Sequence, residues 1–255
     1  MKLQLMRNAT LLLDYAGRHI LIDPDFGVKH SRRSFTGKSP NPMTDLPMPT
    51  ERILEGVELV IVSHLHSDHF DAVAQEIIPK HLPLLCQPGD EMVIRSKGFI
   101  DVTPVSDEFD WQGIHLNRTD GHHGLGEVET MMGQVSGFVF QAAGEPTLYW
   151  AGDTVLCDEV QSAVKQYQPD VIVIHSCGAT WPDSADQRSL IVMDDQQTVA
   201  LAKSAADSIL IAVHMEALDH ATVSREMLRQ TAQAALIDAA RLRIPDDGEI
   251  IEISR

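Results

Sequence analysis

A histidine-rich turn constrains the fold of this chain more than any other feature of its sequence. Residues 64–69 read His-Leu-His-Ser-Asp-His, so three histidines and one aspartate fall within six residues. The apolar run at residues 59–62 predicts a buried strand before this turn, and a helix is expected to begin at Asp71. The polar side chains therefore stand on a strand-to-helix turn, where they can converge on one point.

The donor atoms of this turn indicate a class of metal ion. Imidazole nitrogens with a carboxylate suit zinc, iron, manganese or nickel, whereas calcium and magnesium prefer oxygen ligands. Four side chains on one tight turn cannot all reach a single ion, so two adjacent sites are expected. His64 and His66 would bind one ion, and Asp68 and His69 the other. The alternative is a solvated, histidine-rich loop with weak, adventitious metal affinity.

Further candidate ligands follow at intervals along the chain. Asp153 stands after a predicted strand in Gly-Asp-Thr, and His214 ends the apolar run at residues 209–213. Active-site residues favour strand ends, although Asp153 could instead be a turn residue and His214 a core histidine. A histidine pair, His122 and His123, lies in a glycine-rich stretch. Adjacent residues of an extended segment point opposite ways, so only one of the pair can face the ions.

In this order, the motifs resemble those of the metallo-β-lactamase superfamily. Its signature is His-x-His-x-Asp-His after a strand, followed by a later His, a Gly-Asp-Thr and a strand-end His. The resemblance runs through most of the chain, and the chain looks like the branch of ascorbate-6-phosphate lactonase-like hydrolases and N-acylphosphatidylethanolamine phospholipase D-like enzymes. It implies an α/β fold, namely a four-layer αβ/βα sandwich with a dinuclear metal site at the sheet edge.

The resemblance also implies how two divalent first-row ions share the ligands, with zinc as the first choice and manganese or iron as alternatives. The first ion would be held by His64, His66 and His123. The second would be held by Asp68, His69, Asp153 and His214, with Asp153 bridging both ions. Asp23, in an early Asp-Pro, is expected to orient a metal-bound histidine. His122 would line the pocket, and His175 would end a strand at the active-site edge.

Length and patterning predict one domain over residues 1–255. The early strands come without helices and the later strands alternate with them, which suits two packed sheets with helices outside. We expect one strand at residues 111–118, a loop at 121–133, a loop between the strand ending at 175 and the helix starting at 195, and a last helix over 224–242.

Charge and cysteine content limit the partners and the compartment. The net charge of −17 argues against a nucleic-acid groove. The three scattered cysteines, the absence of a signal-peptide core and the absence of a long apolar run predict a cytoplasmic protein that does not bind membranes. A small-molecule substrate is expected. The resemblance allows the protein to form a homo-oligomer, and no interface can be identified in the sequence.

Residues 24–50 are predicted to form a long loop beside the pocket. The basic cluster Arg32, Arg33 and Lys38 lies in this loop, on an otherwise acidic chain. Loops of this length usually serve a site or are solvated insertions. In the first case the arginines would contact an anionic substrate.

Together these predictions describe a metal-dependent hydrolase. A metal-bridged hydroxide would attack a small, anionic ester, lactone or amide, with Asp68 and Asp153 holding the nucleophile. His220 is a candidate proton donor or substrate contact, and a surface-loop histidine is the alternative. No Gly-x-Ser-x-Gly elbow or phosphate-binding loop is present in the sequence. Two other functions stay open: a phosphodiesterase for a lipid or nucleotide, and a non-hydrolytic metal-binding or diiron protein.

Overall fold

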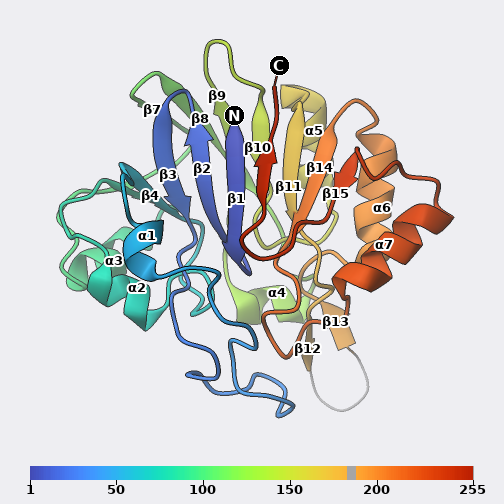
Figure 1. The fold of residues 1–255 in the computed structure, drawn as a ribbon, viewed down its shortest axis with the longest axis horizontal. Helices are drawn as coiled ribbons and strands as arrows, with labels where there is room; N and C mark the ends of the chain where they lie inside the picture. Colours follow the sequence, from blue (N-terminus) through green and yellow to red (C-terminus); the bar gives the residue numbers. More distant parts are fainter. Residues whose placement is uncertain (183–187, 255) are drawn as a thin grey trace.

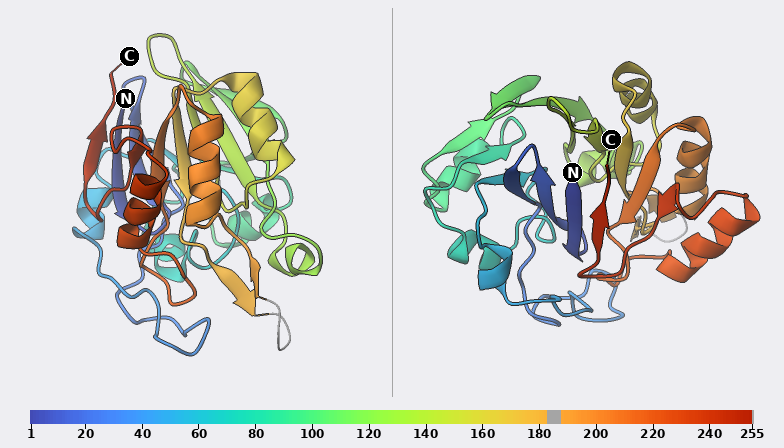
Figure 2. Two further views of the ribbon diagram at one scale, coloured as in Figure 1. Left: turned by 90° about the vertical axis from the view of Figure 1, so that its right-hand side faces the viewer. Right: turned by 45° about the horizontal axis from the view of Figure 1, so that its top comes forward.

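The computed structural model describes residues 1–182 and 188–254. Two seven-stranded sheets pack face to face, and helices cover their outer faces (Figure 1). The layering is visible in the turned views (Figure 2) and confirms the predicted αβ/βα sandwich. Among the described residues, no helix is both long enough and apolar enough to cross a membrane.

The first sheet comes mainly from the N-terminal part of the chain. Its strand order is β16-β1-β2-β3-β4-β5-β6, where β1–β3 form an antiparallel meander and β3–β6 run parallel. Short helices connect the parallel strands. The elements are β1 (Lys2–Arg7), β2 (Thr10–Tyr15), β3 (Arg18–Ile22), α1 (Thr50–Ile53), β4 (Leu59–Val62), α2 (Ala72–Ile77), β5 (Leu84–Cys86), α3 (Glu91–Ser96), β6 (Val102–Pro104) and β16 (Ile250–Glu252).

The second sheet has the order β15-β14-β11-β10-β9-β8-β7, with β10, β11, β14 and β15 parallel. Three longer helices cover its outer face. The elements are β7 (Glu108–Trp111), β8 (Ile114–Asp120), β9 (Ser136–Gln141), β10 (Leu148–Trp150), α5 (Asp158–Tyr167), β11 (Val171–His175), α6 (Asp195–Ser204), β14 (Ile209–Val213), α7 (Arg225–Ala234) and β15 (Leu242–Arg243). Helix α4 (Glu127–Met132) and the hairpin strands β12 (Thr180–Pro182) and β13 (Arg188–Leu190) lie beyond one end of the sandwich (Figure 1).

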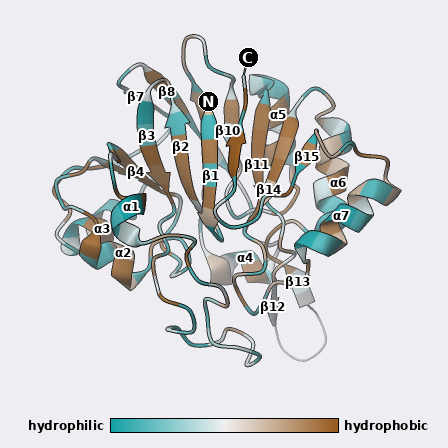
Figure 3. Ribbon diagram, in the orientation of Figure 1, coloured by the Kyte–Doolittle hydropathy of each residue, from teal (hydrophilic) through white to brown (hydrophobic). Residues whose placement is uncertain are grey.

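Side-chain alternation along the strands builds three apolar layers. On β11, Val171 and Val173 face the core between the sheets, whereas Ile172 and Ile174 face the outer helices. Strands buried on both faces read as continuous apolar runs, because each face packs against another layer. Figure 3 shows this hydrophobic colouring along β10, β11 and β14.

Two predicted elements near the glycine-rich segment are wrong. Residues 111–118 do not form one strand, since Gln112 and Gly113 take positive φ angles of 49° and 85° and reverse the chain between β7 and β8. The predicted loop at 121–133 contains α4, which is bounded by Gly126 and Gly133. These glycines end a short helix and do not mark an irregular loop.

Two later predictions also need correction. The helix expected over 224–242 ends at Ala234, and Leu236 takes a left-handed φ of 58° that a helix cannot continue through. The chain then returns to the sheet as β15. The loop predicted between residues 175 and 195 contains β12 and β13, and residues 183–187 of that loop lie outside the described residues.

The segment between β3 and α1 is anchored by a buried carboxylate. Asp25 accepts hydrogen bonds from Nη1 and Nη2 of Arg32 at 2.6 and 2.7 Å. It also lies 3.4 Å from Nη2 of Arg7, and the side chains of Asp25 and Arg7 are fully buried. Arg32 in turn donates to the carbonyl of Ser67 at 2.7 Å, which ties the segment to the histidine-rich turn.

We expect Asp25→Ala to lower the free energy of unfolding by about 3–5 kcal/mol, because it leaves a buried arginine without a counter-charge. Denaturant unfolding at neutral pH measures this loss. The matched control is Glu58→Ala, which removes a half-exposed ion pair with Arg18 and should cost only about 0–1 kcal/mol. Similar losses in the two variants would contradict the central role of Asp25.

Candidate metal centre

The seven predicted metal ligands meet at one edge of the sandwich. The histidine-rich turn follows β4, Asp153 follows β10 and His214 follows β14. Parallel strands present their carboxyl ends at a common sheet edge, and the two sheets bring their edges together here. Two groups of donor atoms result, and each group is compact enough to hold an ion.

The first group contains His64, His66 and His123, whose ring nitrogens lie within 4.8 Å of one another. Nε2 of His123 is 3.3 Å from Nδ1 of His66. Nε2 of His64 is buried and has no hydrogen-bond partner among the described residues. A buried polar atom without a partner is costly, and a bound cation would satisfy it.

The second group contains His69, Asp153, His175 and His214. Nε2 of His69 and Nε2 of His214 are 3.3 Å apart. Oδ2 of Asp68 joins them, at 3.2 Å from the His214 nitrogen and 3.5 Å from the His69 nitrogen.

Asp153 lies between the two groups. Its Oδ2 atom is 3.2 Å from Nε2 of His69 and 3.4 Å from Nε2 of His123. One carboxylate therefore faces both groups, as a bridging ligand must. The preceding Gly152 permits this position, since its φ is 71° and a Cβ atom there would lie 2.7 Å from the carbonyl oxygen of Ser136.

The ring nitrogens that face away from the centre also have partners. Metal-bound histidines are usually oriented through this second nitrogen. Asp23 accepts from Nδ1 of His69 at 2.6 Å and also accepts from the backbone and hydroxyl of Ser63. Its role in orienting a metal-bound histidine stays a prediction. The other Nδ1 partners are Ile191 O for His123, at 2.7 Å, Ser63 Oγ for His64, at 3.0 Å, and Cys177 Sγ for His214, at 3.4 Å.

The electrostatics of the centre call for positive charge. Burial lowers the pKa of His64 well below its usual range and lowers that of His123 to about 4, so both rings are neutral lone-pair donors. Burial also acts to lower the pKa of His69 and His214, but the carboxylate of Asp153 raises both well above their usual range. Without metal, these two rings hold protons that balance the nearby carboxylates. Bound metal ions would supply the same positive charge, so the donor set fits metal ions.

Comparison with known proteins agrees with this geometry. The family model described as the beta-lactamase superfamily domain matches residues 18–215. The UPF0173 protein YddR of Bacillus subtilis (strain 168) is 34% identical over 255 residues, covering 98% of this chain and 98% of the relative. The chain belongs to the metallo-β-lactamase superfamily.

Two solved structures of this superfamily match along almost the whole chain. The isothiocyanate hydrolase from Delia radicum gut bacteria is 34% identical, with a TM-score of 0.91 and coverage of 100% of both chains. A possible metal-dependent hydrolase from Veillonella parvula DSM 2008 is 32% identical, with a TM-score of 0.93 and 99% coverage of both. The predicted superfamily and the predicted enzyme class, a metal-dependent hydrolase, are confirmed. The finer resemblance to lactonase-like enzymes stays a prediction.

His175 lies among these candidate ligands but is oriented differently from them. The indole N–H of Trp150 donates to Nε2 of His175 at 3.0 Å. Indole nitrogen can only donate, so Nε2 carries the lone pair and Nδ1 carries the proton. Nδ1 lies 2.5 Å from Oδ1 of Asp153 and therefore donates to it. Both nitrogens are engaged, and we infer that His175 orients Asp153 and does not bind metal.

Three predicted roles are not supported by the structure. His122 is turned away from the centre, with Nε2 3.0 Å from Oε2 of Glu159, and does not line the pocket. Arg32 is committed to Asp25, because that buried carboxylate needs a counter-charge. Arg33 is exposed and lies outside the pocket lining of the described residues.

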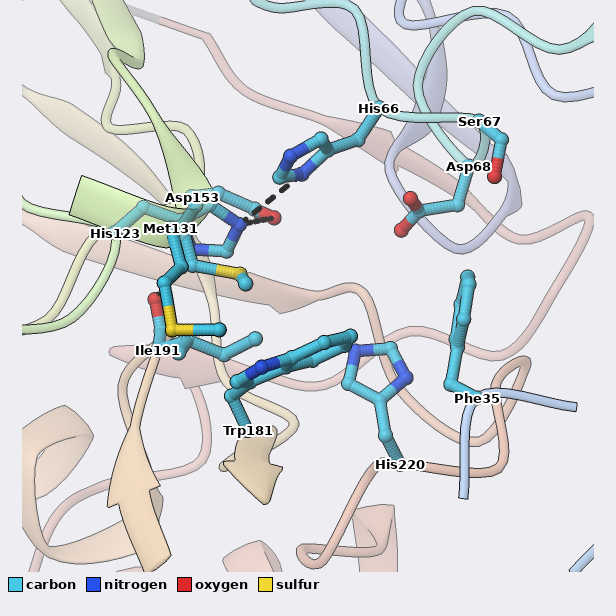
Figure 4. A pocket seen from close by; sticks show the side chains of 11 residues that line it. Phe35, His66, Ser67, Asp68, His123, Met131, Asp153, Trp181, Ile191 and His220 are labelled. Carbon is cyan, nitrogen blue, oxygen red and sulfur yellow. Dashed lines mark hydrogen bonds and ion pairs between the residues drawn. The ribbon is translucent and has the colours of Figure 1, made fainter. Parts of the chain in front are cut away.

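A cavity of about 270 Å³ opens beside the two groups of ligands. Apolar side chains from three separate segments form much of its wall: Phe35 from the long loop, Met131 and Met132 from α4, and Trp181 and Ile191 from the region of the β12–β13 hairpin. Figure 4 shows Trp181 and His220 across the cavity from His66 and Asp68. The loop was predicted to adjoin the pocket, but these apolar residues were not predicted from the sequence.

We expect His175→Leu to weaken metal affinity by about 10–100-fold, since Asp153 loses the donor that orients it. His175→Asn can still donate a hydrogen bond near the Nδ1 position and should lose less. Competition with a chromophoric chelator measures both affinities. If the two variants lose affinity equally, or if either loses one ion entirely, His175 would be a metal ligand.

Proposed function

We propose that this protein hydrolyses small, uncharged substrates with an electrophilic carbon, and that isothiocyanates are its substrate class. The cavity is the observation that carries this proposal, because an apolar wall faces the ligand groups and no lysine or arginine of the described residues lines it. An isothiocyanate, R–N=C=S, offers an apolar substituent and a reactive carbon without charge. The 34% identical isothiocyanate hydrolase supports the same choice.

We also propose that two divalent first-row ions occupy the centre, with zinc as the preferred metal. The ligands would be those predicted from the sequence: His64, His66 and His123 for one ion, and Asp68, His69, Asp153 and His214 for the other. When bound, such ions lower the pKa of water and polarise the substrate. The remaining chemistry depends on side chains of the chain itself.

The proposed reaction balances with one water molecule. The water oxygen forms a bond to the central carbon, and the nitrogen receives a proton, which gives a thiocarbamic acid. The carbon–nitrogen bond then breaks, the nitrogen takes the second proton, and the products are an amine and carbonyl sulfide. One isothiocyanate and one water thus yield one molecule of each product.

In the proposed reaction, Asp68 holds the attacking water. Its carboxylate lines the cavity and lies on the side of the ligand groups (Figure 4). Although burial raises the pKa of Asp68, His69 lowers it well below the usual range, so the group is ionised and can accept a hydrogen bond from water.

In the proposed reaction, His220 delivers a proton to the substrate nitrogen. It is 7% exposed and lines the cavity, and its Nδ1 atom is buried without a hydrogen-bond partner among the described residues. Burial lowers the pKa of His220, so the ring is neutral and offers one N–H donor and one acceptor. A neutral imidazole can accept a proton from the attacking water at one ring nitrogen and then, as the imidazolium, donate a proton to the substrate nitrogen.

The residue before His220 positions the apolar wall. The Asp219 carboxylate accepts from the backbone N–H of Phe35 at 2.9 Å and from Nδ2 of Asn41 at 2.8 Å. These bonds hold the Phe35 ring against His220, with centroids 5.0 Å apart and an interplanar angle of 86°. The pocket loop and the proposed proton donor are thereby fixed as one unit.

A substrate panel tests the proposed class. With zinc supplied, we expect kcat/KM for benzyl isothiocyanate to exceed that for a phosphorylated lactone by at least about 100-fold, because no lysine or arginine among the described residues of the cavity wall offsets the cost of burying the phosphate. Amine release measures the first reaction and acid release the second. Chelation should abolish both activities, and added zinc should restore them. A higher kcat/KM for the anionic lactone than for benzyl isothiocyanate would overturn the proposal. An apolar ester turned over as fast as benzyl isothiocyanate would extend the proposed substrate class to uncharged carbonyl compounds.

Replacement of His220 tests the proton donor. We expect His220→Ala to lower kcat by about 10²–10⁴-fold with little change in KM, since general acids act on the transition state. The pH profile of kcat should lose one limb at the same time. His81→Ala, which removes an exposed histidine, is the matched control and should leave both parameters unchanged. A raised KM with normal kcat would show that His220 only contacts the substrate.

A further inference from the structure

A separate group of metal-binding side chains lies outside the catalytic centre, between α4 and α5. It consists of His122, Cys157 and Glu159, and one donor atom from each lies within 4.8 Å of the other two. Donors around one zinc ion are separated by roughly 3–4 Å, because the bonds to the ion are about 2.0–2.3 Å long. Small side-chain rotations would therefore bring the three donor atoms to bonding distance from one ion.

The His122 ring is already oriented for binding. Its Nδ1 atom contacts the carboxylate of Glu129 on α4, so Nδ1 carries a proton and donates it. The Nε2 atom then faces Oε2 of Glu159 at 3.0 Å. Nε2 is therefore also within donating distance of a carboxylate, and an ion that binds there would take the place of its proton while Glu129 keeps the ring oriented, as a carboxylate usually does for a metal-bound histidine.

Access distinguishes this group from the catalytic ligands. The side chains of His122 and Glu159 are 30% and 42% exposed, and Cys157 is half-buried. Most of the catalytic ligands, in contrast, are buried. An ion can therefore reach this group from solvent without passing through the substrate cavity.

We propose that His122, Cys157 and Glu159 form a third divalent-metal site with zinc as its preferred ion. An imidazole, a thiolate and a carboxylate are a donor set that zinc accepts, and three protein ligands leave a fourth position for water. Binding would release the thiol proton of Cys157 and the proton on Nε2 of His122 to solvent, since the thiolate and the neutral imidazole are the forms that bind metal.

The third site is linked to the catalytic centre through the chain. His122 adjoins His123, and its backbone N–H donates to Oγ1 of Thr154, the neighbour of Asp153, at 2.9 Å. Glu129, which orients His122, belongs to the helix that carries Met131 of the cavity wall. An ion held here would fix α4 relative to α5 and so influence both a ligand histidine and the substrate wall.

Cobalt titration of the metal-free protein tests this site. The proposed catalytic ligands supply only nitrogen and oxygen, so a thiolate-to-cobalt charge-transfer band in the near ultraviolet would report the Cys157 site alone. We expect that band to appear and to be lost in Cys157→Ser. Zinc content should fall from about three ions per chain to about two in the same variant.

Two further variants identify the source of the signal. Cys86→Ser removes a buried cysteine and should leave the band unchanged. Cys177 lies beside His214, so loss of the band in Cys177→Ser would assign it to the catalytic centre and overturn the third site. No band, together with about two zinc ions in the unaltered protein, would also overturn it. None of these readouts depends on substrate turnover, so they are independent of the proposed reaction.

Discussion

The convergence of buried imidazoles and carboxylates on Asp153 is the constraint on which the rest of this structure depends. Side chains from both sheets place acidic oxygens and ring nitrogens in a space almost closed to water. Such a group is costly unless positive charge offsets it. Protonated His69 and His214 can supply that charge, and bound divalent ions would supply it while leaving all the rings neutral.

The surrounding structure holds these ligands in place at some local cost. Asp23 and His214 adopt left-handed φ angles of 45° and 64°, which cost of order 1–3 kcal/mol each for residues other than glycine. Asp23 then orients His69, while Trp150 acts through His175 on the bridging carboxylate. The apolar core on both sides of each sheet offsets this strain, since the strands that carry the ligands are buried on both faces.

The reactive centre and the substrate wall come from different parts of the fold. The candidate ligands follow the strands of the two sheets, and the superfamily shares this sandwich. The wall comes from segments outside both large sheets, namely the Phe35 loop, α4 and the β12–β13 hairpin. Loops and additions on a rigid scaffold commonly set specificity. The apolar character of these segments is why we favour an uncharged substrate over the anionic one expected from Arg32 and Arg33.

The sequence by itself determined the histidine-rich turn at residues 64–69, the sandwich and the hydrolase class, because these depend on local spacing and on the order of strands. It also predicted that Asp23 contacts a histidine of the site, and the structure pairs Asp23 with His69. Only the tertiary structure decided which way His122 points and which carboxylate pairs with Arg32. The partners of both side chains lie elsewhere in the chain and come close only in the folded protein. The apolar wall was likewise hidden, because Phe35, Met131 and Trp181 become neighbours only when distant segments fold over one edge of the sandwich.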